Sequence, residues 1–522
     1  MRRKFAYGMS MVVLSLVLLS GCGKEEVFEQ EVVQNVQEME EESQSDEQEN
    51  MEIESNINWA KAPVLSLTEW IDNRFADDGT LLVEGRFQVV EVSGEGYEAV
   101  AETVREWTIK QEEAFEESVD LNEGYALDEV GVSPSFYGYT STVELNPTRA
   151  DASVISLEGF YYDYSGGSHG NYFFSGATFD SQRGQQLTFW DLTEDKEAFA
   201  KKTLDTALEQ ITEEYGDGLF EGYEAIIREI WESEPDWYLD GAGLTIVFSP
   251  YEIGPYALGT VYARLTYQEL GTLLKTEYQM GPQAGIAVLP LGEVAEISLN
   301  HETGEKGTVQ LYLKSEEDDG GIHKYILKVG RHTEIAAQID RLENIYLLQR
   351  EDGRTFLLFD GDMASDDYVT YMYEITDSQI KKTYESSVCA YICKGTITTE
   401  GVRMGIRVDA LGTYTAYGDF EIMENGSLES IREWYDIENS YEWQGLTNIR
   451  DLPVVVEGEE TILPSGSHIR IIGTNMNGIL KYQLSDSLEE GEIHYTTGED
   501  NWPVYIDGIN ETEYFEMLPY VG

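Results

Sequence analysis

Alternating apolar and polar positions predict strands near the start of the folded region. Leu81 to Val92 (LLVEGRFQVVEV) shows the alternation of a half-buried strand. Tyr97 to Val119 instead carries apolar residues at helical spacing among acids, which favours an amphipathic helix. Ser133 to Leu145 and Ala152 to Tyr164 again have the alternating or aromatic pattern of strands. This region therefore mixes strands with a helix.

The next region has the same mixed character and begins with a glycine-rich turn at Gly166 to Gly170. Helices are expected over Asp195 to Glu234, with a break near Gly216 to Gly218, because glycine is a poor helix former. The strands expected here are a strand from the turn through Phe179, a short one at Gln186 to Phe189, and strands at Leu244 to Ser249 and Thr260 to Tyr267. The pattern predicts an α+β fold for the N-terminal half.

From Gly285 onward the helix signals almost vanish, which predicts a mostly β C-terminal half. Strands recur between hairpin-type turns such as Asp352-Gly353 and Glu316 to Gly321. The expected strands are Val309 to Leu313, Tyr325 to Val329, Ile345 to Arg350, Arg354 to Phe359 and Tyr368 to Ile375. The last region has short strands at Ser467 to Ile472, Ile479 to Leu484, Trp502 to Ile506 and Tyr514 to Leu518, whose spacing resembles a bacterial SH3-like barrel.

The first 22 residues have the pattern of a lipoprotein signal peptide. Arg2, Arg3 and Lys4 precede a short uncharged apolar core, and Leu19-Ser20-Gly21-Cys22 resembles a lipobox. The core is shorter than the roughly 20 apolar residues that a membrane-spanning helix needs. The resemblance implies that Cys22 is acylated, for example by palmitate, and that the chain lies on the extracellular face of the cytoplasmic membrane. An ordinary secretory signal is the alternative.

The composition shows a large negative net charge and an acidic segment near the N-terminus that is typical of a tether. The chain of 522 residues has 99 acids against 34 Lys and Arg, a formal net charge of −65. Such a charge repels nucleic acid and anionic membrane surfaces. It has two interpretations: an acidic surface that keeps the protein soluble, or electrostatic attraction of cationic partners. The segment from Lys24 to Asn56 is acidic and poor in large apolar residues, so it predicts a disordered tether.

The length is too great for one compact core, and about three or four folded domains are expected. The predicted units are the signal peptide and lipobox at 1–22, an acidic tether at 23–58, a small α+β domain at 59–150, a second α+β domain at 151–280, an all-β domain at 281–445 and a small barrel-like domain at 446–522.

Motifs for catalysis or metal binding are weak. Gly166-Gly167-Ser168-His169-Gly170 matches G-x-S-x-G, but the nucleophile elbow requires a strand–turn–helix context, whereas a strand follows here. No His pair has metal-ligand spacing, so no metal or cofactor is expected. Asp360 and Asp362 could attract calcium but lack EF-hand spacing. Cys389 and Cys393 are about 13 Å apart on an extended strand, which predicts two thiols unless the strand bends.

Aromatic residues form a third constellation. Tyrosines precede the glycine turn, further aromatic residues follow it, and others lie in the later Pro-containing segment. Half of these rings could simply fill the core. However, tyrosine is favoured at recognition surfaces because it offers apolar area and a hydroxyl at low entropic cost. The candidate ligand-binding residues are Tyr161, Tyr162, Tyr164, His169, Tyr251, Glu252 and Tyr256.

Three stretches together resemble one family. They are Tyr161 to Gly170 (YYDYSGGSHG), Thr178 to Leu192 (TFDSQRGQQLTFWDL) and Phe248 to Gly259 (FSPYEIGPYALG). In this order they resemble the extracellular domain of RsiV-type lysozyme-sensing anti-sigma factors, a module also present in PdaC-type peptidoglycan deacetylases. The resemblance covers residues of about 60 to 275. It implies a two-part α+β binding module whose ligand in the anti-sigma branch is lysozyme, a strongly basic protein.

Neither sigma-factor control nor deacetylation carries over, because the sequence shows no sigma-binding segment and no Asp-His-His metal set. The sequence therefore predicts a non-enzymatic surface lipoprotein of a Gram-positive bacterium. Its partner would be a lysozyme-like cationic protein or peptidoglycan, and its only membrane attachment would be the lipid. Two alternatives remain: a cell-wall-modifying hydrolase, using Ser168 and His169 or carboxylates in the all-β half, and a structural or accessory surface protein.

Overall fold

The computed structural model describes residues 59–132, 136–281, 283–291, 294–300, 306–317, 323–329, 331–363, 367–376, 379–386, 390–437, 445–485, 487–498 and 502–520. The predicted signal segment, the lipidation site at Cys22, the tether, Cys389 and the side chain of Cys393 lie outside what is described. Within the described residues, none of the helices combines the length and apolar character that crossing a membrane requires.

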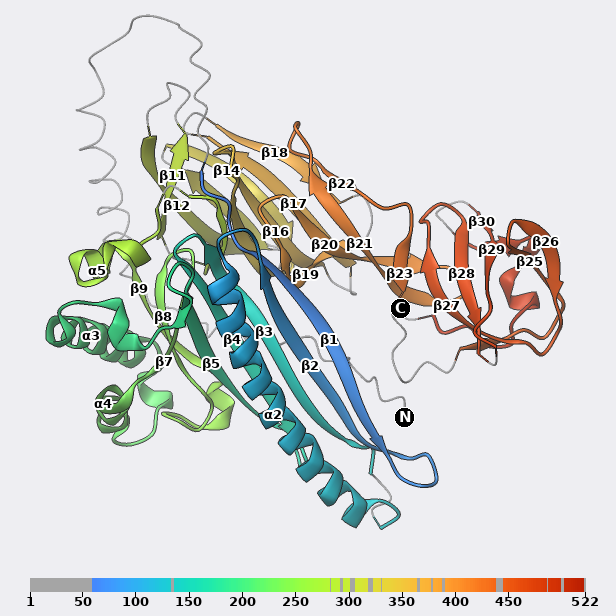
Figure 1. The fold of residues 1–522 in the computed structure, drawn as a ribbon, viewed down its shortest axis with the longest axis horizontal. Helices are drawn as coiled ribbons and strands as arrows, with labels where there is room; N and C mark the ends of the chain where they lie inside the picture. Colours follow the sequence, from blue (N-terminus) through green and yellow to red (C-terminus); the bar gives the residue numbers. More distant parts are fainter. Residues whose placement is uncertain are drawn as a thin grey trace, which may run out of the picture.

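An 11-stranded sheet forms the centre of the molecule (Figure 1). Its strands are β1 (Val64–Phe75), β2 (Leu81–Ser93), β3 (Tyr139–Asp151), β4 (Val154–Tyr164), β5 (Asn171–Asp180), β6 (Gln185–Gln186), β10 (Gly285–Val288), β15 (Arg341–Gln349), β16 (Thr355–Met363), β17 (Asp367–Ile375) and β18 (Ile380–Glu385).

Strand β3 holds this sheet together. It pairs with β4 along almost its whole length, with β2 in parallel near its start, and with β10 near its end. The order continues from β10 through β15, β16 and β17 to β18. One sheet therefore runs through segments assigned to three of the predicted units, whose boundaries remain predictions.

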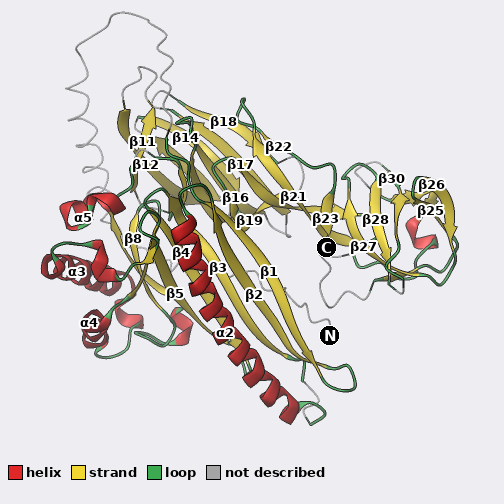
Figure 2. Ribbon diagram, viewed as in Figure 1, coloured by secondary structure: helices red, strands yellow, loops and turns green. Residues whose placement is uncertain are grey.

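Helix α2 (Glu98–Glu129) crosses one face of the sheet and connects the parallel strands β2 and β3 (Figure 2). It extends ten residues beyond the expected end at Val119, because Asn122 and Ala126 continue its buried face. Asn122 Nδ2 donates to Ser141 Oγ of β3 at 2.8 Å. Gly85 of β2 makes room for the helix, since a Cβ there would lie 3.1 Å from the Phe115 ring.

Most of the other helices gather in a helical lobe, residues 189–278, beside strands β4 and β5 (Figure 1). The lobe consists of η1 (Phe189–Leu192), α3 (Lys196–Tyr215), η2 (Gly216–Gly218), α4 (Tyr223–Ser233), β7 (Asp236–Leu239), β8 (Gly243–Phe248), η3 (Tyr256–Leu258), β9 (Val261–Thr266), α5 (Tyr267–Leu270), η4 (Gly271–Leu273) and η5 (Thr276–Tyr278).

The lobe has its own buried core, and the helix break expected at Gly216 to Gly218 is confirmed. Strand β7 lies so close to β5 that a Cβ on Gly176 would lie 1.7 Å from the Trp237 carbonyl oxygen. The strand expected over Gln186 to Phe189 is wrong beyond Gln186. Asp191 Oδ2 accepts from the backbone N–H and the hydroxyl of Thr188, and this capping starts the short helix η1 instead.

The described residues after 281 are mostly β, as expected. They include a four-stranded sheet, an 11-stranded sheet and a three-stranded sheet. The four-stranded sheet contains β11 (Val294–Asn300), β12 (Lys306–Glu317), β13 (His323–Val329) and β14 (His332–Ile339). The larger sheet begins with β19 (Ala390–Ile397), β20 (Gly401–Asp409), β21 (Thr413–Ile422), β22 (Leu428–Ser430) and β23 (Tyr435–Ile437).

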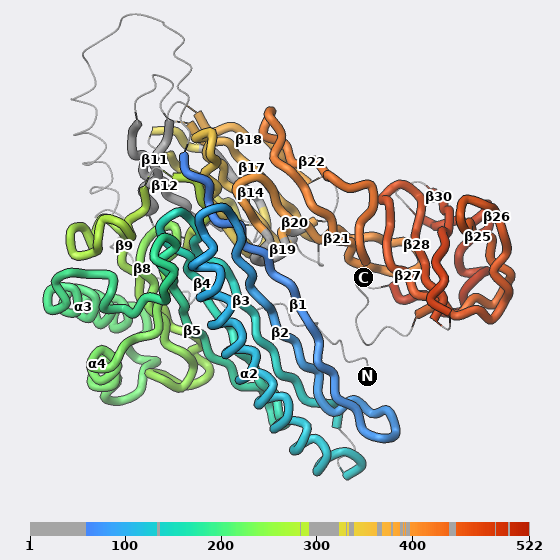
Figure 3. The backbone as a smooth tube through the Cα atoms, viewed as in Figure 1, coloured from blue at the N-terminus to red at the C-terminus, as the bar shows by residue number. Residues whose placement is uncertain are grey.

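The C-terminal strands lie at one end of the molecule, drawn in orange and red in Figure 3. They are β24 (Leu446–Thr447), β25 (Leu452–Val456), β26 (Glu459–Leu463), β27 (His468–Thr474), β28 (Ile479–Leu484), β29 (Glu490–His494), β30 (Thr496–Thr497), β31 (Val504–Ile506) and β32 (Ile509–Asn510), followed by the short helix η7 (Glu511–Glu513).

The expected SH3-like barrel is not found among the described residues. Strand β23 pairs with both β21 and β27, so the sheet continues outward in the order β21-β23-β27-β28-β29-β25-β26 and does not close. The strand expected at Tyr514 to Leu518 is also wrong. Tyr514 and Phe515 donate their backbone N–H groups to the Glu511 carbonyl in a turn, and Phe515 forms only an isolated bridge.

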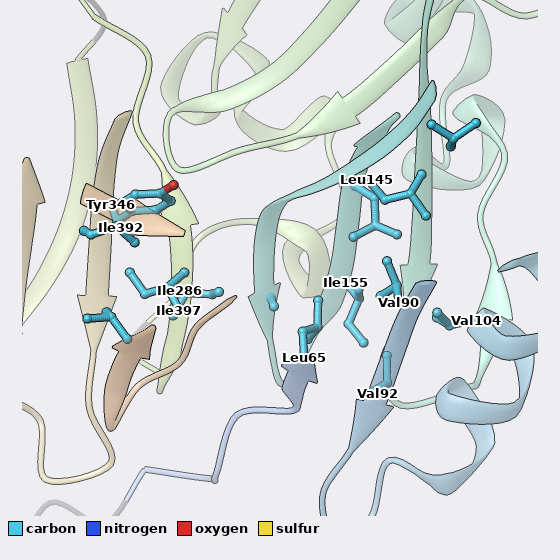
Figure 4. Close-up of a cluster of buried hydrophobic side chains, with 14 of the residues drawn as sticks. Leu65, Val90, Val92, Val104, Leu145, Ile155, Ile286, Tyr346, Ile392 and Ile397 are labelled. Atoms are coloured by element: carbon cyan, nitrogen blue, oxygen red, sulfur yellow. The ribbon is translucent and has the colours of Figure 1, made fainter. Parts of the chain in front are cut away.

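Apolar packing joins the N-terminal strands to the C-terminal half. Figure 4 shows Leu145 and Ile155 of β3 and β4 in the same cluster as Ile286, Tyr346 and Ile392. All five side chains are buried. Because burying apolar surface stabilises by roughly 25 cal/mol per Å², this cluster ties together segments that are far apart in the sequence.

A fully buried arginine holds the helical lobe against β3. Arg149 Nε donates to Asp151 Oδ2 at 2.6 Å, and Nη1 donates to Tyr267 OH at 2.7 Å and to the Tyr278 carbonyl oxygen at 2.6 Å. Nη2 donates to the Gln279 carbonyl at 3.2 Å. Burial alone would lower the pKa of Arg149, but the negative charge of Asp151 raises it overall, so the guanidinium stays charged.

We expect Arg149→Ala to destabilise the lobe by about 3–5 kcal/mol, because it leaves the Asp151 carboxylate buried without its counter-ion. Urea unfolding followed by tryptophan fluorescence would measure this, since Trp231 and Trp237 lie in the lobe core. Arg105→Ala is the matched control, because Arg105 pairs with Glu102 at an exposed site. Equal unfolding midpoints for the two variants would contradict the assigned role of Arg149.

Candidate functional site

The structure brings several of the predicted ligand-binding residues together at the end of the β4–β5 hairpin. The His169 ring stacks on the Tyr256 ring at a centroid distance of 4.0 Å. The rings of Tyr251 and Tyr172 both lie near the Tyr256 ring, each at a centroid distance of 5.6 Å. The Tyr162 ring lies beside Gly170, where a Cβ would be 2.5 Å from it. We call Tyr162, His169, Tyr172, Tyr251 and Tyr256 the aromatic surface.

Two loops position this surface. The turn after β4 has positive φ at Gly166 and Gly167, which glycine adopts without strain. The second loop follows β8 and is joined to the hairpin through Ser249, whose Oγ accepts from Phe174 N at 3.0 Å. Glu252 closes this loop, because its carboxylate accepts from Ser249 N at 2.9 Å. The Ser249 side chain thus holds the loop after β8 against β5, which brings the rings of the two loops together.

Other predicted residues lie elsewhere. Tyr161 faces helix α2, where its hydroxyl donates to Gln111 Oε1 at 2.8 Å, and its ring stacks on Phe173 at 4.5 Å. Tyr164 contacts the edge of the Tyr139 ring, and its hydroxyl donates to the Gly167 carbonyl at 3.3 Å. Alternation along β4 separates Tyr161 from Tyr162, since successive side chains point to opposite faces.

Burial raises the pKa values of two acidic groups near this surface. Desolvation raises the pKa of Glu252, and the charge of Asp236 adds to the effect. Burial likewise raises the pKa of Asp236, against a hydrogen bond from Ser175. Desolvation also raises the pKa values of Tyr162 and Tyr256, so both phenols are neutral hydrogen-bond donors near neutral pH.

The G-x-S-x-G stretch lies in a hairpin between two strands. β4 ends at Tyr164 and β5 begins at Asn171, so Ser168 does not precede a helix as the nucleophile elbow requires. His169 Nδ1 lies 2.8 Å from the Gly170 carbonyl.

The described residues contain no candidate metal site. No group of three His, Cys, Asp or Glu side chains gathers there as a metal site would need. Of the acids considered for calcium, Asp360 accepts from Thr370 Oγ1 at 3.3 Å, and Asp362 pairs with Arg341 at 3.2 Å.

Sequence reasoning missed Glu158, Asp240 and Arg264, which line a cavity between β4 and the helical lobe. Of these three residues, only Asp240 lies in a recognisable local pattern, the Asp240-Gly241 dipeptide that is typical of a hairpin turn and here connects β7 to β8. Tyr172 is one of the aromatic residues that follow the glycine turn, but it is not among the predicted ligand-binding residues. Its place beside Tyr256 depends on the loop after β8.

Comparisons with known proteins identify one domain in the chain. The sequence model of the family described as "Protein of unknown function (DUF3298)" matches residues 191–268, most of the helical lobe. The chain therefore contains a DUF3298 domain, inside the unit predicted at 151–280. No curated protein matches the chain.

Three solved structures resemble parts of the chain. A DUF3298 family member from Bacteroides fragilis has 18% identity and covers 42% of this chain and 96% of its own, with a TM-score of 0.33. A DUF3298 family protein from Pseudomonas aeruginosa has 13% identity, covers 43% and 99%, and has a TM-score of 0.30. TolB from Acinetobacter baumannii has 11% identity, covers 70% and 81%, and has a TM-score of 0.17.

Tyr251 has φ of 71°, a conformation that costs a residue with a Cβ roughly 1–2 kcal/mol. We therefore expect Tyr251→Gly to be about 1 kcal/mol more stable than Tyr251→Ala, although both variants lose the ring. Thermal unfolding of the two variants would measure the difference. Equal stabilities would show that the backbone at this position is not strained.

The raised pKa of Glu252 gives a second expectation. Since the folded state holds the proton more tightly than the unfolded state, the contribution of Glu252 to stability falls as pH rises above about 4.3, the ordinary value for Glu. Glu252→Gln removes this ionisation while its amide oxygen can still accept from Ser249 N. The variant should gain stability relative to the native protein between acidic and neutral pH. Unfolding midpoints measure this, and exposed Glu221→Gln, the control, should show no such gain.

Proposed function

We propose that this chain is a non-enzymatic, lipid-anchored surface protein of a Gram-positive bacterium that binds a cationic protein of the lysozyme type through the aromatic surface. The observation that carries the proposal is Tyr251. Its ring is 54% exposed beside Tyr256, and a positive φ holds it there. Strained backbone is kept where the surrounding structure enforces it, and such positions cluster at binding sites.

The chemistry of the surface suits a cationic protein. Tyrosine rings attract Lys and Arg side chains through cation–π interactions, and each neutral phenol adds a hydrogen-bond donor. The net charge of −65 steers a basic protein toward the chain and accelerates encounter. The resemblance of the two loops to RsiV-type lysozyme-sensing modules supports the same partner. The lipid at Cys22 would hold the site at the outer face of the cytoplasmic membrane.

Peptidoglycan is the second candidate ligand. The observation that favours it is the continuation of aromatic contacts away from Tyr256, through Tyr172 and Phe160 to Phe174. An extended row of rings offers a long, largely apolar strip that a polymer chain could follow. A globular partner would need only the exposed end of the row.

We expect the double variant Tyr251→Ala/Tyr256→Ala to bind hen-type lysozyme at least about tenfold more weakly, a loss of about 1.4 kcal/mol. The full-length chain in detergent would be measured by calorimetry at low salt and at about 0.15 M salt. Saturable binding that persists at the higher salt is expected for the native protein, because ring contacts are not screened.

The matched control is Tyr125→Ala/Tyr137→Ala, which removes two exposed tyrosines far from the aromatic surface in sequence. It should bind as the native protein does. Native affinity of the Tyr251/Tyr256 variant, with an unchanged circular dichroism spectrum, would refute the aromatic surface as the site. Binding that disappears at physiological salt would indicate attraction by net charge alone.

A further inference from the structure

A cavity of about 150 Å³ lies where three parts of the chain meet. Asn146 and Glu158 come from β3 and β4 of the central sheet. Tyr238 and Arg264 come from β7 and β9 of the helical lobe, and Asn344 comes from β15. Pro147, Val288, Pro290 and Tyr346 complete much of the wall. The cavity thus forms only when the lobe, the central sheet and the C-terminal half are assembled.

Several polar groups of the wall are held in place by the protein itself. Asp240 accepts from Ala242 N, Gly243 N and Thr245 Oγ1 at 2.8–2.9 Å. The guanidinium of Arg264 lies over the Tyr262 ring at 4.9 Å, and the Tyr262 hydroxyl donates to Glu158 Oε1 at 3.4 Å. A preorganised wall of this kind reduces the ordering cost of binding.

Asn146 of the wall carries an acceptor that no described residue satisfies. Asn146 Oδ1 is buried and accepts no hydrogen bond from the described residues. Buried polar atoms in folded proteins nearly always have a partner, so such an atom calls for an explanation. A ligand that offers an O–H or N–H group to Asn146 would satisfy it.

The charges of the wall favour a neutral ligand. Arg264 and Glu158 bring opposite charges, and the carboxylate of Asp240 is already bound by three donors. The wall therefore offers both donors and acceptors. Hydroxyl groups donate and accept at once, so a ring that carries several of them can match such a wall.

We propose that this cavity binds a neutral polyhydroxylated ring the size of one monosaccharide. A cavity of about 150 Å³ holds one six-membered ring. The site is separate from the aromatic surface, and the proposal does not depend on the proposed partner of that surface. It also assigns a binding role to residues after 281, which carry no recognisable motif.

Saturation-transfer NMR on the full-length chain in detergent tests the proposal, with glucose, galactose and N-acetylglucosamine as probes and glycine and serine as zwitterionic comparisons. A single sugar is expected to bind with Kd on the order of 1 mM, given its small number of atoms. Saturable signals from at least one sugar and none from the amino acids are the expected result. Signals from the amino acids alone would overturn the assignment of a neutral ligand.

Two variants locate the binding. Val288→Phe places a larger side chain in the cavity and should abolish the sugar signal. Glu158→Gln keeps an acceptor for the Tyr262 hydroxyl but removes the charge, and should weaken binding about tenfold. Tyr125→Ala is the control, because Tyr125 is exposed and belongs neither to the cavity wall nor to the aromatic surface, and it should leave sugar binding unchanged. Absence of a saturable signal from every sugar, or binding that survives both cavity variants, would overturn the proposal.

Discussion

The buried guanidinium of Arg149 is the interaction on which the arrangement of the molecule depends. It bonds to Asp151 in the same strand, to groups of Tyr267 and Tyr278 in the helical lobe, and to the carbonyl of Gln279, the residue that follows the lobe. A buried charge is stable only when its partners stay in place, so the network permits one docking of the lobe against β3. Because β3 also pairs with β2, β4 and β10, that docking positions both binding regions.

Strand β4 connects the two regions. Glu158, Phe160 and Tyr162 lie on one face of this strand. Tyr161 and Asp163 face helix α2, where Asp163 accepts a hydrogen bond from Ser118 Oγ. The outward face thus runs from the aromatic surface to the cavity, with Phe160 between them. The other face of β4 packs against helix α2 through Tyr161 and Asp163. A single strand therefore divides its side chains between the two proposed binding regions and the packing of helix α2, according to the alternation of the β conformation.

Strand pairing and apolar packing attach the C-terminal half to the central sheet. Strand β10 adds to the edge of β3, and Ile286, Tyr346 and Ile392 join the same apolar cluster as Leu145. The strands that follow β23 extend one sheet outward and leave its end unclosed. The part of this half nearest the lobe supplies a wall of the cavity, whereas the outer strands lie at the far end of the molecule (Figure 3).

The sequence by itself determined the local elements and the chemistry available. Periodicity located β2, β4 and β8, the break between α3 and α4, and the mostly β second half, because these depend on neighbouring residues. The residue types of the sequence also indicated Tyr251 and Tyr256 as candidate ligand-binding residues. Only the tertiary structure decided that Tyr161 faces α2, that Tyr172 joins Tyr256, and that Glu158, Arg264 and Asn344 share a cavity. Such contacts join residues far apart along the chain, and a local pattern carries no information about which distant strand lies beside another.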